Sequence, residues 1–315
     1  MSTAVRSLGD EAAANRKGIA TFLLITFGVT YAVEGALGLA GFRWEGVPPL
    51  LGQYLIIAVM WVPALAAGLT LRFVHREGLA GAYLRFGPLK PYLFSILIIP
   101  LVFALVYALT WLLGLGRPDW GLEFFQAQLV EMGADLTGMP PAGQILSFLF
   151  LSSLVTGPTL NALFAFGEEL GWRGYLLPRL MPLGKPKAYL LLGLIWGLWH
   201  APLILMGFNY PGYPLAGVVW MCALTLSIGI FINEMTLRYR SSILAGVIHG
   251  AFNGQAYGIW RILFPTAHPL LGGMAGLVGI LVFALLGLWT LRRFSHRPAA
   301  EPGQAAPARP AQPEG

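Results

Sequence analysis

Residues 161–180 read NALFAFGEELGWRGYLLPRL, an apolar stretch with two consecutive carboxylates, Glu168 and Glu169, near its middle. A helix of this length and composition can enter a membrane, where an ionisable side chain costs about 2.5–3.5 kcal/mol on insertion scales. Such side chains therefore face the interior of a helix bundle or a wet cavity rather than lipid. The stretch predicts a membrane fold with a functional site inside it.

Two other apolar stretches carry the same kind of exception. Residues 190–203 read LLLGLIWGLWHAPL and hold His200, and residues 241–254 read SSILAGVIHGAFNG and hold His249 and Asn253. Carboxylates, imidazoles and an amide are the groups that activate a water molecule by general-base or metal-assisted chemistry. We expect three helices to bring these residues together in one cavity that opens toward the cytoplasmic half of the membrane.

The composition excludes a soluble globular protein. The 315 residues are 57% hydrophobic and 11% charged, whereas soluble chains are about 45–50% apolar and about 25% charged. We therefore expect a multi-pass protein of the cell membrane, with the lipid bilayer as its surroundings. The net charge of +6 is explained by basic residues that flank membrane helices, so no nucleic-acid partner is expected.

Apolar runs of about 20 residues, the length that spans a bilayer, recur along the chain and predict an all-α membrane helical bundle. About eight transmembrane helices are expected, near residues 19–40, 51–71, 92–114, 144–167, 188–207, 214–236, 242–262 and 270–291.

The basic residues predict the topology of this bundle. Of the 20 Lys and Arg, all but Arg43, Arg117 and Arg261 fall in the N-terminal segment, in alternate loops, or in the C-terminal tail. Because loops rich in Lys and Arg stay in the cytoplasm, this alternation predicts an even number of spans with both termini cytoplasmic.

Three regions are expected along the chain. Residues 1–18 are a polar N-terminal segment, residues 19–294 form the transmembrane domain, and its functional core covers about 145–262. The tail 295–315 is rich in Pro, Ala and Gln and is expected to be disordered. No internal repeat is evident, which disfavours an inverted-repeat transporter.

Helical spacing divides the polar residues into pairs. Glu169 and Arg173 are four residues apart and should face each other as an ion pair, which leaves Glu168 as the freer carboxylate and candidate general base. His249 and Asn253 share one helix face in the same way, among small residues that allow close helix approach. Each feature alone also fits a structural role, such as a buried ion pair or an interhelical hydrogen bond.

Glu34 is another carboxylate within an expected span. It comes near the end of the first span, and we expect it to reach the outer headgroups.

Read in order, Glu168-Glu169-x-x-x-Arg173, then Trp196-x-x-x-His200, then His249-x-x-x-Asn253 resembles the CPBP family. That family includes the type II CAAX prenyl endopeptidases and the bacteriocin-processing or abortive-infection membrane proteins. The resemblance covers residues from about 145 to 262. One departure is Trp196, because the prenyl endopeptidases usually have Phe at that place.

The resemblance implies an intramembrane protease, a hydrolase that is glutamate-dependent or a metalloprotease. Glu168 would activate water with help from His200, and His249 and Asn253 would stabilise the oxyanion. Glu169 and Arg173 would orient the site. A divalent metal such as zinc could be held by Glu168, His200, His249 and Asn253, and a metal-free general-base mechanism uses the same residues, so the sequence leaves both open.

The expected partner is a membrane protein or peptide substrate, either prenylated or bacteriocin-like. Two other classes remain open: a non-catalytic membrane protein with a binding, immunity or regulatory role, and an ion-coupled transporter. The complete set of motifs favours the enzyme, because neither other class requires all of it.

Overall fold

The computed structural model describes residues 8–44 and 50–294, and the regular elements of that part of the chain are all helices. The all-α fold predicted from the sequence is confirmed. The α-helices in chain order are α1 (Leu8–Leu39), α2 (Leu50–Val59), α3 (Val62–Thr70), α4 (Leu89–Leu112), α5 (Glu123–Glu131), α6 (Ala142–Thr156), α7 (Ala162–Glu169), α8 (Leu177–Leu180), α9 (Lys185–Trp199), α10 (Ala201–Leu205), α11 (Pro214–Tyr239), α12 (Ser242–Ala256), α13 (Ile259–Leu263) and α14 (Leu277–Phe294).

Within the described ranges, six helical stretches are long and apolar enough to cross a membrane. The protein is therefore a multi-pass membrane protein, and each of the six overlaps one of the eight expected spans. These stretches are Glu11–Leu39, Ile57–His75, Leu89–Leu112, Ala142–Leu183, Pro214–Tyr239 and Leu277–Phe294.

The two remaining expected spans, 188–207 and 242–262, are interrupted helices. α9 ends at Trp199, and Pro202 stands at the start of the short helix that follows, while α12 ends at Ala256. α9 and α12 have 15 residues each, or about 22 Å at 1.5 Å per residue, less than the roughly 30 Å of hydrocarbon that a span must cross. The count of eight spans therefore stays a prediction, with six supported by length.

The fourth span continues as a helix beyond the double glutamate, as the sequence predicts. Residues Ala142–Leu183 form one helical stretch of 42 residues. Two π-helical segments interrupt its α-helical path, at Gly157–Asn161 and at Leu170–Leu176. Such wide turns occur frequently at functional sites, and the second one begins directly after Glu169 and contains Arg173.

Close helix contacts through glycine hold the centre of the bundle together. α11 packs against α9 and α14, and α12 packs against α7 and α4. A Cβ atom at Gly197 would lie 2.5 Å from the Cα atom of Cys222 on α11, and one at Gly250 would collide with the backbone of Ala162 on α7. Small residues therefore allow these backbones to approach closely, which brings α12 beside the double glutamate.

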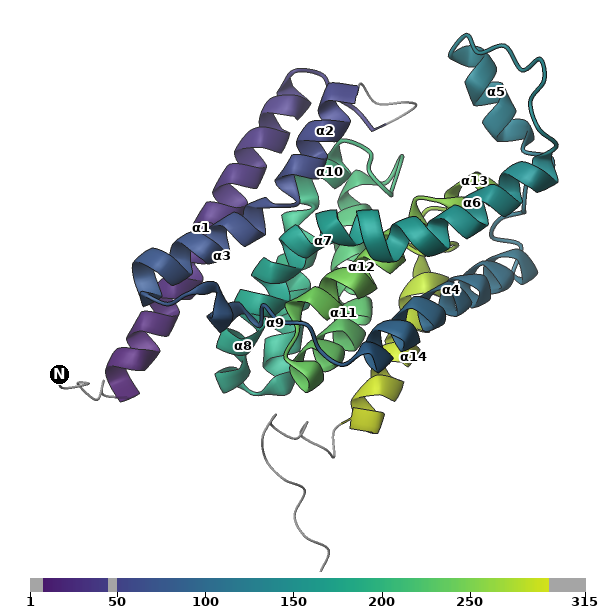
Figure 1. The fold of residues 1–315 in the computed structure, drawn as a ribbon. Helices are drawn as coiled ribbons and strands as arrows, with labels where there is room; N and C mark the ends of the chain where they lie inside the picture. Colours follow the sequence, from purple (N-terminus) through teal and green to yellow (C-terminus); the bar gives the residue numbers. More distant parts are fainter. Residues whose placement is uncertain (1–7, 45–49, 295–315) are drawn as a thin grey trace, which may run out of the picture.

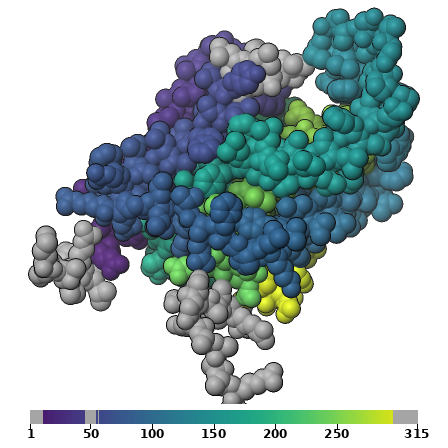
Figure 2. All heavy atoms as spheres, in the orientation of Figure 1, coloured from purple at the N-terminus to yellow at the C-terminus, as the bar shows by residue number. Residues whose placement is uncertain are grey.

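The surface and the ends of the bundle fit a membrane orientation. Leu24 and Leu101 are 74% and 65% exposed, as expected for side chains that face lipid rather than water. The start of α1 and the end of α14 lie toward the same end of the bundle in Figure 1, which agrees with an even number of crossings. Figure 2 shows that the segment around α5 projects from the body.

The expected regions at the two termini are only partly covered by the structure. α1 begins at Leu8, so the described part of the expected polar segment 1–18 is helical and continuous with the first span. The expected disordered tail, 295–315, lies outside the described residues.

Candidate active site

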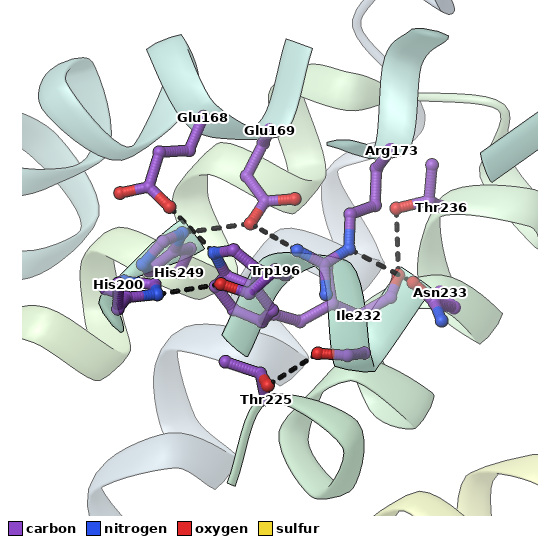
Figure 3. A network of polar contacts seen from close by, with 11 residues as sticks. Glu168, Glu169, Arg173, Trp196, His200, Thr225, Ile232, Asn233, Thr236 and His249 are labelled. Carbon is purple, nitrogen blue, oxygen red and sulfur yellow. Dashed lines mark hydrogen bonds and ion pairs between the residues drawn. The ribbon is translucent and has the colours of Figure 1, made fainter. Parts of the chain in front are cut away.

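Glu169 and Arg173 form a fully buried ion pair at the junction of α7 and the π-helical segment. Arg173 Nη1 lies 2.8 Å from Glu169 Oε1, and both side chains are 0% exposed. Arg173 Nε also donates to Asn233 Oδ1 of α11 at 3.0 Å. The predicted pairing is confirmed, and the pair ties the fourth span to α11 (Figure 3).

Glu169 also binds His249 of α12. His249 Nδ1 lies 2.9 Å from Glu169 Oε1, the same oxygen that accepts from Arg173. The contact fixes the orientation of the imidazole ring. The other ring nitrogen, Nε2, is not bound to Glu169. Glu169 therefore binds both Arg173 and His249 and is enclosed between them.

Glu168 has a different partner, the indole of Trp196. Trp196 Nε1 donates to Glu168 Oε2 at 2.8 Å, and the guanidinium of Arg173 lies 4.1 Å from the centre of the Trp196 ring. The sequence identified Trp196 only as a departure from the Phe of the prenyl endopeptidases. The signal that could have revealed the contact is the indole N–H itself, because a buried N–H of tryptophan usually finds an acceptor.

His200 lies at the break between α9 and α10. Its Nδ1 donates to the backbone carbonyl of Trp196 at 2.8 Å, because a carbonyl oxygen can only accept. The Nε2 atom of His200 is consequently unprotonated when the ring is neutral and can accept a hydrogen bond.

One cavity of about 110 Å³ joins these groups. Glu168, His200, His249 and Asn253 all line it, so the expectation that they converge in a single cavity is confirmed.

The direction in which this cavity opens stays a prediction. Tyr257, directly after the end of α12, is 38% exposed, and Asn209 donates to its hydroxyl at 3.1 Å. The lining residues Ile228 and Ile232 of α11 are buried.

Glu34 belongs to this cavity rather than to the headgroup region, which corrects the sequence-based expectation. Its side chain lines the cavity, and the residue is only 3% exposed. Thr30 and Thr26, one and two turns earlier on α1, are fully buried as well. A stripe of polar residues at four-residue spacing on a lipid-embedded helix marks the face that points into the bundle, and this pattern was available in the sequence.

The residues do not fit a metal centre. In the part of the chain that the structure describes, no three His, Cys, Asp or Glu side chains are grouped so that they could hold a metal ion. One ring nitrogen of each imidazole is engaged, His249 Nδ1 with Glu169 and His200 Nδ1 with a carbonyl. Metal-bound imidazoles make the same contacts, so the separation of the side chains, and not these hydrogen bonds, disfavours a metal. A zinc site with three protein ligands would require a different arrangement of Glu168, His200 and His249.

Comparisons with known proteins identify the segment that carries the site. Residues 144–255 match the family model described as type II CAAX prenyl endopeptidase Rce1-like. Over 106 residues the chain is 36% identical to a protein of Methanococcus maripaludis named CAAX prenyl protease 2. That alignment covers 32% of this chain and 39% of the relative, so the chain matches about two fifths of the relative's length. Glu34 lies outside the matched segment.

Proposed function

Because residues 144–255 match the family model described as type II CAAX prenyl endopeptidase Rce1-like, we propose that the protein is an intramembrane endopeptidase that hydrolyses a peptide bond of a membrane-associated substrate. The observation that carries the proposal is the single cavity lined by Glu168, His200, His249 and Asn253, which come from three separate parts of the chain. The family match supplies the reaction class, and the contacts of each side chain support its role.

Glu168 is the general base of the proposed reaction. Trp196 holds its Oε2, which leaves Oε1 to accept a proton from a water molecule in the cavity. His200 Nε2 accepts the other hydrogen of that water, because Nδ1 is bound to a carbonyl. Two acceptors thus hold the water with a lone pair free to attack the carbonyl carbon of the substrate.

His249 and Asn253 stabilise the negative charge that develops on the substrate oxygen. The proposed role requires the imidazolium form of His249, in which Nδ1–H donates to Glu169 Oε1 and Nε2–H donates to the oxyanion. The amide of Asn253, one helical turn later, donates beside it. Glu168 then passes the proton it took from water to the leaving amine, which completes the cleavage.

Glu169 and Arg173 are positioning residues in this mechanism. Both are fully buried and neither lines the cavity, so they act through His249 and through the stacking of Arg173 on Trp196.

The proposed substrate is a membrane protein or peptide. A prenylated protein is one candidate because the relative is named a CAAX prenyl protease, and a bacteriocin-like peptide is the other. Comparative proteomics of membrane peptides from cells with the wild type or Glu168→Ala should reveal an uncut substrate that accumulates only in the variant.

The matched control for that comparison is Glu131→Gln, which removes an exposed carboxylate at the end of α5. The control should give the wild-type peptide pattern. If the wild type cleaves no membrane peptide while Glu168→Ala still fulfils the cellular role, a non-catalytic binding function replaces this proposal.

A further inference from the structure

Glu34 is a buried carboxylate without a hydrogen-bond partner at one of its oxygens. The residue is 3% exposed, Oε2 has no partner, and the side chain lines the same cavity as Glu168. An ionised carboxylate that is removed from water and left unpaired is strongly unfavourable, so the group is either protonated or reached by a donor or a cation. The proposed hydrolysis does not use Glu34, so its place in the cavity wall requires another explanation.

The composition of the cavity wall indicates which ligand would complete this carboxylate. The described residues that line it include two glutamates and no Lys or Arg. The guanidinium of Arg173 is paired with Glu169 behind the wall, and His249, the cationic group of the proposed mechanism, is also held by Glu169. The cavity wall therefore presents Glu34 and Glu168 with no Lys or Arg to compensate them, in an environment where charges interact strongly.

Aromatic side chains add to this preference for a cation. Trp196, Trp199, Phe208 and Tyr257 line the cavity, and the faces of aromatic rings attract ammonium and guanidinium groups. A metal ion is a poorer fit, because three ligating side chains are not grouped anywhere in residues 8–44 and 50–294. An organic cation needs only one carboxylate and an aromatic surface.

We propose that Glu34 is the binding site for a protonated amine or guanidinium, supplied by a Lys or Arg side chain of the substrate near the scissile bond. The inference rests on the proposed endopeptidase function and assigns its specificity to a residue outside the matched segment. Glu34 would hold the basic side chain at one end of the cavity while Glu168 acts on the peptide bond.

The test uses the full-length protein in detergent and two membrane-anchored peptides that differ only by Lys or Gln beside the scissile bond. Dissociation constants are measured by titration calorimetry, and kcat/KM is measured where cleavage occurs. The wild type should bind and cleave the Lys peptide at least about tenfold better than its Gln twin, as expected for a charge-assisted hydrogen bond.

In Glu34→Gln this ratio should fall to about one, whereas Glu131→Gln should keep the wild-type ratio. Equal binding of the two peptides by the wild type would overturn the inference, even if Glu34→Gln fails to fold. Cleavage of both peptides at equal rates would overturn the inference and leave the proposed function intact. A Lys preference in binding without any cleavage would support the cation site and contradict the peptidase.

Discussion

The consecutive residues Glu168 and Glu169 lie in different surroundings. Glu169 is fully enclosed, and a single oxygen binds both Arg173 and His249. Glu168, one residue earlier, lines the cavity and receives one hydrogen bond, from Trp196. A helix turns about 100° per residue, so neighbours face different regions. We infer that the groups around a buried carboxylate, rather than its residue type or depth, set its role.

The buried ion pair of Glu169 and Arg173 is expected to stabilise the fold. Arg173→Ala should therefore have the largest effect on stability. Removal of the guanidinium leaves Glu169 as an unpaired buried charge, which should lower the free energy of unfolding by about 3–5 kcal/mol. Thermal melting in detergent measures this loss, and cleavage should fall with it.

The matched control is Arg179→Ala. Arg179 forms a 3.2 Å ion pair with Glu77, whose side chain is 51% exposed, and such pairs contribute at most about 1 kcal/mol. If the two variants melt at the same temperature, the ion pair of Arg173 is not the stabilising contact that the comparison requires.

The residues that line the cavity are expected to affect the rate of cleavage rather than the stability of the fold. Asn253→Ala removes one proposed oxyanion donor and should lower kcat about 10²–10³-fold, with little change in melting temperature. Single-turnover cleavage of a membrane peptide measures the effect. Asn161→Ala serves as the control, because Asn161 is on the same long helical stretch but does not line the cavity. A rate unchanged by Asn253→Ala would remove Asn253 from the mechanism.

Trp196 contacts both Glu168 and Arg173. Loss of its indole N–H should have a smaller effect on the rate. Trp196→Phe keeps the aromatic ring but removes the N–H that holds Glu168, so kcat should fall about tenfold. Trp220→Phe removes a similar indole hydrogen bond, to the carbonyl of Leu270 at 2.7 Å, outside the cavity and should leave kcat unchanged. Equal rates for the two variants would mean that the Trp196 hydrogen bond does not position Glu168.

The sequence was sufficient for the features that follow from local spacing. Apolar runs predicted the long membrane helices, and the four-residue spacing predicted the Glu169–Arg173 pair. The membrane cost of ionisable groups predicted that Glu168, His200 and His249 would meet. Each of these inferences depends only on residue spacing within one helix or on the cost of placing an ionisable group in lipid. Both can be read directly from the sequence.

Contacts between distant helices could not be predicted in the same way. The bond from Trp196 to Glu168 and the bond from His249 to Glu169 depend on how closely α9 and α12 approach α7. Glu34 is an intermediate case, because the polar stripe on α1 indicated its direction but not the cavity that it reaches.

The most direct measurement compares Glu168→Gln with Glu169→Gln in one preparation, by thermal melting and by kcat/KM on a cleaved membrane peptide. Glu168→Gln should melt like the wild type and lose about 10²–10⁴-fold in rate, the usual contribution of a general base. Glu169→Gln should melt at a clearly lower temperature because Arg173 loses its partner. Full cleavage by Glu168→Gln, or equal melting of Glu169→Gln and the wild type, would contradict the division of roles between the two carboxylates.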